Sequence, residues 1–325
     1  VLPADLSDVP KCEIRDVADE AYFDGRIARL AVKALGTLQQ NKQPFFLAVG
    51  FWKPHAHFNA PKKYWDLYDP KQISIAANRQ PPIDVPSIAL HDGREICRAF
   101  KDRPGGKPTA EDAVTLRHGY YAAISYVDAQ LGRVLDEVDR LGLLDHTIIV
   151  FWSDHGFHLG EHGLWAKTSN FELDARVPMI ISSPQHRGGC RSDAIVELID
   201  LFPTLIDLCR LPATNHKLEG VTLRPLLENP MRRVKSAAFT WHPRPAYPPA
   251  GQPPDAMGYS MRTNRYRYTE WRNHSTGEVL ARELYDHDND PGENRNLSND
   301  SRHREVLKKL NVLMEREWDL SVKQQ

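Results

Sequence analysis

Ionisable side chains are concentrated in one short stretch, residues 154–167. They are Asp154, His155, His158, Glu161, His162 and Lys167. A carboxylate oxygen suits Ca²⁺ or Mg²⁺, whereas an imidazole nitrogen suits Zn²⁺ better. Asp154 and His155 therefore predict a metal-assisted active-site loop. The alternative is that Asp154 caps a turn and His155 is simply exposed.

Two further side chains are candidates for binding an anion at this site. Lys167 can hold an anionic oxygen as a point charge, although most lysines lie on the surface. His55 follows another apolar run, and taken alone it is more often a structural or surface histidine. We expect His55 to converge on the crevice of Asp154 and His155 if the sheet is parallel, and Lys167 lies one loop away from them.

The elements that must position these residues are short apolar runs. Ile148 to Trp152 is typical of a strand buried on both faces, and 45–51 and 177–182 predict further buried strands. An open α/β sheet carries its chemistry at the carboxyl ends of its strands. Asp154, His155 and His55 follow such ends.

Helical periodicity alternates with these runs over 16–40, 109–141 and 195–209, and Thr109 to Asp112 resembles a capping box. The alternation predicts an α/β fold over 1–242, with a mostly parallel sheet sandwiched by helices. Prolines then precede a hairpin pattern (258–262 and 266–271), a strand at 283–286 and a helix at 302–318. These predict a smaller α+β domain over 243–325.

Composition excludes some classes of protein. The 325 residues have a formal net charge of −1, which argues against a general nucleic-acid binder, and no apolar run reaches the length of a membrane span. The cysteines form no CxxC pair, so they predict no thiolate zinc site, and they can be reduced or joined in disulfides. The chain begins at Val1 without a signal sequence, as though within a longer polypeptide.

Four segments carry a resemblance to a known family. They are residues 44–56, 120–136, 153–173 and 257–272. In these segments the chain resembles the sulfatase family of the alkaline-phosphatase-like superfamily. That resemblance implies that Ca²⁺ holds the sulfate ester of a sulfated carbohydrate, such as a glycosaminoglycan, beside a formylglycine made from Cys or Ser. It also implies a periplasmic, secreted or lysosomal location.

The resemblance assigns roles to individual residues. It implies that Asp154 and His155 are calcium ligands and that Lys167 and His55 bind the sulfate. It makes either of the latter two a candidate to protonate the leaving oxygen. Phe157, at a position where Trp is expected, and Arg262 would contact the substrate.

The chain also departs from the family pattern. No cysteine or serine stands in C/S-x-P-x-R, and Ser182-Ser-Pro184 is followed by His186 at the fifth position. The early pair of Asp ligands is missing as well. We therefore expect the carboxy-terminal part of a sulfatase, with the nucleophile, the remaining calcium ligands and the first strands outside this chain. An exposed sheet edge would then invite self-association.

The sequence is also consistent with two other functions. One is a phosphoester or phosphonate hydrolase of the same superfamily. The other is a non-catalytic protein that binds sulfated glycans.

Overall fold

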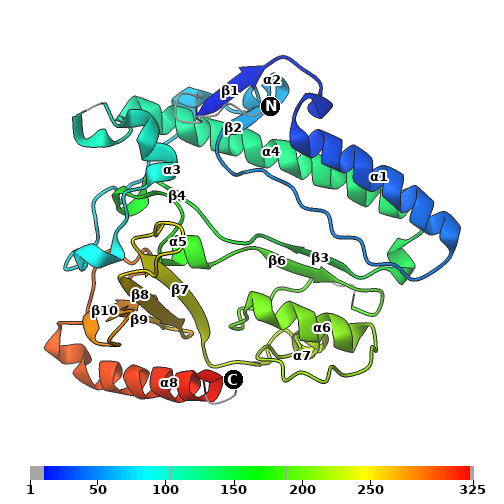
Figure 1. Cartoon of the computed structure of the whole chain (residues 1–325). Helices are drawn as coiled ribbons and strands as arrows, with labels where there is room; N and C mark the ends of the chain where they lie inside the picture. The colour runs from blue at the N-terminus through cyan, green and yellow to red at the C-terminus, as the bar shows by residue number, and fades with distance from the viewer. Residues whose placement is uncertain (1–10, 103, 187–188, 323–325) are drawn as a thin grey trace.

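The computed structural model describes residues 11–102, 104–186 and 189–322. Two long helices lie along one side, two short strands cross the middle, and on the opposite side a four-stranded sheet lies next to the carboxy-terminal helix (Figure 1). The helices are α1 (Phe23–Asn41), α2 (Lys62–Trp65), α3 (Arg94–Cys97), α4 (Ala110–Arg140), α5 (Glu172–Ala175), α6 (Leu201–Leu208), α7 (Arg224–Glu228) and α8 (Arg304–Val322). The strands are β1 (Cys12–Arg15), β2 (Phe58–Pro61), β3 (Ile149–Trp152), β4 (His158–Leu159), β5 (Trp165–Ala166), β6 (Met179–Ser182), β7 (Ala238–Arg244), β8 (Ala256–Arg262), β9 (Tyr266–Asn273) and β10 (Val279–Asp286).

The long helix α4 begins and ends close to where its sequence predicts. The Asp112 amide donates to Thr109 Oγ1 at 3.2 Å, and the Thr109 amide donates to the Asp112 carboxylate at 2.8 Å, which confirms the capping box. Gly142, with φ of 67°, follows the helix in a left-handed conformation that favours glycine. Apolar side chains of α4 and α1 then pack together (Ala28, Ala31, Leu35, Val134 and Val138).

The strand before Asp154 pairs differently from the expectation. β3 pairs with β6 in antiparallel register, from Ile149 opposite Ser182 to Trp152 opposite Met179. Among the described strands only β1 and β2 form a parallel pair. The reason lies in the connection, residues 153–178, whose two ends are hydrogen-bonded to each other. The Ser153 amide donates to the Pro178 carbonyl at 3.4 Å and the Gly156 amide to the Asp174 carbonyl at 2.8 Å. The chain therefore returns beside the end of β3 that it left, and β6 runs antiparallel to β3.

The segment 45–51 does not form the buried strand that its composition predicts. It is extended, but no described strand pairs with it. Alternate side chains (Phe45, Leu47, Val49 and Phe51) pack against the α1–α4 core, while Phe46 is 83% exposed. In β3, Phe151 and Trp152 are likewise 37% and 48% exposed. The expected burial on both faces is wrong because the described residues supply a packing layer on one face of 45–51 only.

The carboxy-terminal sheet matches its pattern more closely. Its strand order is β10-β9-β8-β7, all antiparallel, and β8 and β9 form the predicted hairpin. Met261, Tyr268 and Leu284 are buried against Leu310 and Met314 of α8. The sheet already includes β7, so it begins before residue 243. The division of the chain at 242 stays a prediction.

Candidate active site

Asp154 and His155 lie in the turn directly after β3. The Asp154 side chain is 81% exposed, and its Oδ1 accepts the His155 amide at 3.0 Å. His155 Nδ1 lies 2.8 Å from the carbonyl oxygen of Gly156, so this nitrogen must be the donor. The lone pair of the neutral ring is then on Nε2, 3.5 Å from Asp154 Oδ2. The carboxylate oxygen and this imidazole nitrogen thus lie close enough to share one cation.

Gly156 is required here by close packing and not by an unusual φ. A Cβ at this position would lie 1.8 Å from the carbonyl oxygen of Leu173. The Gly156 and Phe157 amides donate to the carbonyls of Asp174 and Leu173 at 2.8 and 2.9 Å. The turn is therefore fixed against α5.

Lys167 and His55 are in contact with each other, although β3 and β6 are antiparallel and His55 is not among the residues that line the cavity with Asp154 and His155. Lys167 Nζ lies 2.9 Å from His55 Nε2 and donates to Glu95 Oε2 at 2.5 Å. His55 Nδ1 lies 2.5 Å from the Ala56 carbonyl oxygen and therefore donates to it, so Nε2 accepts from the ammonium of Lys167. Burial lowers the pKa of His55; the Ala56 carbonyl opposes this and the charge of Lys167 reinforces it. In this arrangement the ammonium group of Lys167 is the part of the pair that can hold an anionic oxygen, and the neutral imidazole orients it.

The backbone that presents Lys167 is strained on both sides. Ala166 has φ of 73° and Thr168 has φ of 93°, in the region that side-chain-bearing residues avoid. Strain of this kind persists only where the surroundings enforce it. Here the buried carboxylate of Asp174 accepts the Ser169 amide at 2.8 Å and faces His158 Nδ1 at 2.7 Å. His158 thus supports the loop from within the core.

The loop that carries His55 is anchored by a second buried carboxylate. Asp24 of α1 accepts the backbone amides of Trp52 and Lys53 at 2.6 and 3.1 Å. The Lys53 ammonium donates to the carbonyls of His55, at 3.1 Å, and His57. Burial lowers the pKa of Lys53 to about 8, which fits a structural role inside the loop.

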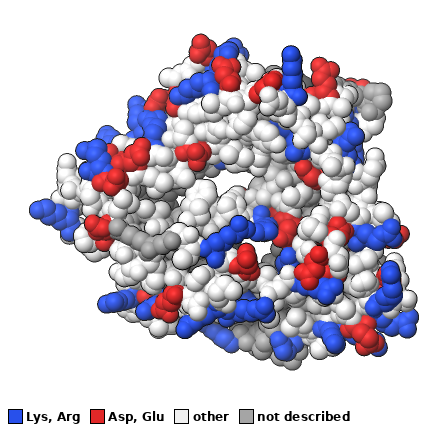
Figure 2. All heavy atoms as spheres, turned by 180° about the vertical axis from the view of Figure 1, so that it is seen from behind, with Lys and Arg blue, Asp and Glu red and all other residues white. Residues whose placement is uncertain are grey.

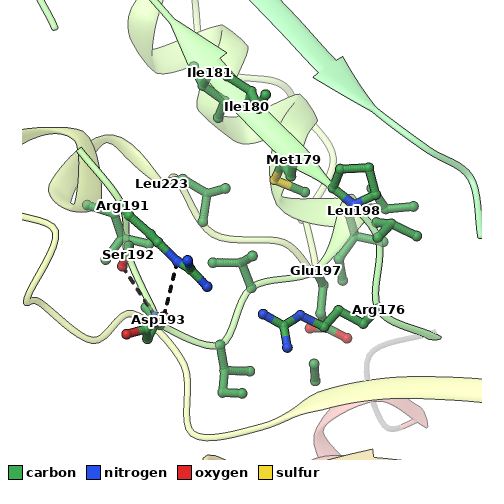
Figure 3. A pocket seen from close by; sticks show the side chains of 18 of the residues that line it. Arg176, Met179, Ile180, Ile181, Arg191, Ser192, Asp193, Glu197, Leu198 and Leu223 are labelled. Atoms are coloured by element: carbon green, nitrogen blue, oxygen red, sulfur yellow. Dashed lines mark hydrogen bonds and ion pairs between the residues drawn. The ribbon is translucent and has the colours of Figure 1, made fainter. Parts of the chain in front are cut away.

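Asp154, His155 and Lys167 line one large cavity of about 2140 Å³. Arg262 lines it as well, with its Nε 3.2 Å from the Glu172 carboxylate. Figure 3 shows part of its wall, formed by β6 and by residues 191–198. On the face of the molecule in Figure 2, acidic and basic side chains are interspersed around a hollowed centre.

Phe157, also predicted to touch substrate, packs its ring against Phe58 and Tyr120, with centroids 6.0 and 5.4 Å away. It contributes to the core beside the site. The prediction that it contacts substrate stays untested.

Asp154 and His155 suit a cation as part of a ligand set. Ca²⁺ takes six to eight oxygen ligands, more than these two residues supply. Within residues 11–102, 104–186 and 189–322, one group of three candidate ligands lies close enough to share an ion: Glu172, His287 and Glu293. Arg267 lies 2.5 Å from the Glu172 carboxylate and 2.7 Å from that of Glu293, so this cluster is a buried ion-pair network.

The sequence did not single out Glu95, Asp24 or Tyr247. Glu95 lies in the short helix α3, in the stretch between β2 and α4, and its contact with Lys167 spans 72 positions of the chain. The predicted strand end pointed to His55, but no local pattern points to a partner so distant.

The free cysteines are Cys12, Cys97, Cys190 and Cys209, so none forms a disulfide. No helix among the described residues is long and apolar enough to cross a membrane.

Solved structures with the same arrangement establish the class of fold. A protein solved in complex with its substrate D-glucosamine-2-N,6-O-disulfate has a TM-score of 0.75 at 22% identity, covering 91% of this chain and 69% of that one. The phosphonate monoester hydrolase from Silicibacter pomeroyi has a TM-score of 0.76 at 25% identity, covering 95% and 62%. The expected alkaline-phosphatase-like fold is therefore confirmed.

Sequence comparison narrows the class to a family. The sulfatase family model matches residues 3–211, and the model of the N-sulphoglucosamine sulphohydrolase C-terminal region matches 160–319. Iduronate 2-sulfatase of Mus musculus is 33% identical over 365 residues, and the Homo sapiens protein is 33% identical over 354 residues. The chain belongs to the sulfatase family. The matches include 92% and 89% of this chain but 66% and 64% of those relatives.

Proposed function

We propose that this chain carries part of the active site of a sulfuric ester hydrolase that acts on a sulfated sugar. The observation that carries the proposal is the contact of Lys167 with His55, in a loop that also lines the cavity of Asp154 and His155. The similarity to iduronate 2-sulfatases supports a sulfated uronic acid of a glycosaminoglycan as substrate. A periplasmic, secreted or lysosomal location goes with that proposal.

Each residue has a role in this proposal. Lys167 would bind the sulfuryl oxygens through its ammonium group, and either Lys167, or His55 once its Nε2 is protonated, would give a proton to the leaving oxygen. Asp154 and His155 would hold Ca²⁺, which would supply charge stabilisation for the sulfuryl group. Arg262 would meet an anionic group of the sugar from the cavity wall, and Phe157 would contact the sugar from beside it.

We place the nucleophile and the remaining calcium ligands outside these 325 residues, because the sequence holds no C/S-x-P-x-R. The unpaired segment 45–51 and the exposed strand β3 offer faces on which further strands can pack. Residues 1–325 alone would then hydrolyse no sulfate ester. Turnover by this chain alone that disappears on Lys167→Ala would contradict this placement.

The runner-up is hydrolysis of phosphonate or phosphate monoesters. It is favoured by the TM-score of 0.71 at 26% identity to the phosphonate monoester hydrolase of Agrobacterium radiobacter. A third possibility is a protein that binds sulfated glycans without catalysis, in keeping with the missing motif.

One assay separates these functions. The complete product of the gene is purified, its metal content is measured, and 4-nitrophenyl sulfate and 4-nitrophenyl phosphate are compared as substrates. We expect calcium and faster turnover of the sulfate. Dominant turnover of the phosphate would establish the runner-up, and binding of sulfated oligosaccharide without turnover of either ester would establish the third function.

A further inference from the structure

The connection between β7 and β8 reaches the side chain of Lys167 indirectly. The hydroxyl of Tyr247, in this connection, donates a hydrogen bond to Glu95 Oε1. The other carboxylate oxygen of Glu95 accepts from Lys167 Nζ at 2.5 Å. Arg94 lies over the Tyr247 ring, 5.1 Å from its centroid, and fixes that ring from one side. A chain of contacts thus runs from Tyr247 through Glu95 to Lys167.

The end of β7, just before this connection, also holds the backbone next to Lys167. Arg244, the last residue of β7, is buried and stacks over Trp271 at 4.6 Å. Its guanidinium donates to the Thr168 carbonyl at 3.0 Å and to the carbonyls of Ile88 and Ala89 at 2.8 and 2.7 Å. The strained residue that follows Lys167 is therefore tied to the carboxy-terminal sheet.

The charge on Glu95 suits a positioning role. Burial raises the pKa of this carboxyl group, but the hydrogen bonds from Lys167 and Tyr247 outweigh burial and lower it. Glu95 is consequently ionised at neutral pH and accepts hydrogen bonds without a proton to give. His55 Nε2 lies 3.8 Å from its carboxylate, beyond hydrogen-bond distance.

We propose that Tyr247 and Glu95 are positioning residues of the anion site, which aim the Lys167 ammonium at the cavity. The proposal rests on the proposed function, because it presupposes that Lys167 binds the sulfate group. Tyr247 fixes the rotamer of Glu95, and Glu95 holds the long, flexible lysine side chain in one orientation. Arg244 supports the backbone of the same loop. Without this support Lys167 would lose rotamer order before binding.

The direct test measures the order of the Lys167 side chain by NMR relaxation of its ammonium group in the complete gene product. Tyr247→Phe is the informative variant, because it removes one hydroxyl and leaves every charge at the site unchanged. Glu95→Gln removes the charge, and Tyr121→Phe on α4 is the matched control. We expect the order of the Lys167 ammonium to fall in the first two variants and to stay at the wild-type value in the control. Unchanged order in both Tyr247→Phe and Glu95→Gln would overturn the proposal.

Kinetics of 4-nitrophenyl sulfate hydrolysis give a second readout. We expect kcat/KM to fall roughly threefold to tenfold in Tyr247→Phe, the loss typical of one hydrogen bond, with the thermal midpoint close to that of the control. An unchanged kcat/KM in a Tyr247→Phe protein would count against positioning. A protein whose Lys167 loses order in both variants but which hydrolyses no sulfate ester would contradict the proposed function and still support the positioning role.

Discussion

The two sheets on either side of the cavity differ in how far their apolar side chains are buried within the chain. In β7–β10 every strand has its antiparallel neighbour, and the central side chains of Trp271, Met261 and Leu284 are fully buried. In the β3–β6 pair, Trp152 is 48% exposed and Ile180 is 60% exposed. Among its described residues the first sheet, called the complete sheet below, has large exposed apolar side chains only on its edge strands, at Trp241 of β7 (51%) and Leu280 of β10 (48%), whereas both strands of the second sheet carry them. The candidate calcium ligands, Asp154 and His155, and the candidate anion-binding Lys167 lie in the chain that follows β3 of the second sheet.

The difference also extends to charge. In the complete sheet, buried ions are paired: Arg267 lies between the carboxylates of Glu172 and Glu293. Burial alone would raise the pKa of Glu293, but the charge of Arg267 and the hydrogen bonds to Glu293 lower it to about 2. In the turn after β3, the carboxylate of Asp154 is exposed and its nearest partner is His155. A charge left available in this way can serve a ligand, whereas the paired charges of the other sheet serve the fold.

The largest effect is expected from a matched pair of tryptophan substitutions, one in each sheet. Trp271→Ala would empty a fully buried site and leave Glu283, which accepts from the indole at 2.8 Å, without that partner. We expect the free energy of unfolding to fall by about 3–5 kcal/mol. Trp152→Ala on β3 should cost about 1 kcal/mol or less, because half of the ring is already in solvent. Urea titration measures both values, and equal losses would contradict the contrast.

A smaller effect is expected from the pH dependence of the complete sheet. Burial raises the pKa of Glu283 to about 7, despite hydrogen bonds from Trp271 and Tyr285. Between the unfolded pKa of about 4.3 and this value the folded chain holds a proton that the unfolded chain has lost. The contribution of Glu283 to the unfolding free energy therefore falls as pH rises through that window. We expect the unfolding free energy of the Glu283→Gln protein, measured by denaturant titration, to fall less than that of the wild type as the pH rises from about 4.5 to about 7. Parallel curves would show that Glu283 titrates normally.

The smallest effect is expected at the exposed face of segment 45–51. Phe46 is 83% exposed on the unpaired segment, and we propose that this face and the edge of β3 allow self-association. Phe46→Ser should weaken any self-association of residues 1–325 by roughly threefold to tenfold, as expected for losing one partly buried aromatic contact. Met231→Ser, at an 86% exposed position elsewhere, is the control. Sedimentation velocity over a range of concentrations compares the two, and an equal association constant would remove Phe46 from the interface.

Local signals predicted helix α4 and the hairpin well because their physical causes are local, whereas α1 begins at Phe23 instead of residue 16 and α6 at Leu201 instead of residue 195. The Thr109–Asp112 capping box and Gly142 define α4 within one residue at each end. Periodicity within 148–152 cannot show strand direction, so the antiparallel pairing of β3 with β6 was not foreseen. The run 45–51 has the composition of a buried strand, but burial depends on neighbours that its own residues do not specify.

The candidate site was predictable to the same extent. Asp154, His155 and His55 are identified by their positions after apolar runs and Lys167 by its place in the loop after Asp154, and the structure brings Lys167 and His55 together. Glu95 and Tyr247 were missed, because a carboxylate and a phenol in Pro-rich segments carry no periodic or spacing signal. Their roles become visible only through contacts that span 72 and 152 positions.

The central claim is that Lys167 binds the sulfuryl group in the site it shares with His55, Asp154 and His155. Its most direct test is kcat/KM for 4-nitrophenyl sulfate in the complete gene product, with Lys167→Ala compared with Lys71→Ala at an exposed position. We predict a fall of about a hundredfold or more for Lys167→Ala, the scale expected when one charge-stabilising group is removed, and wild-type activity for Lys71→Ala. A Lys167→Ala protein that keeps the activity of the control would contradict the account.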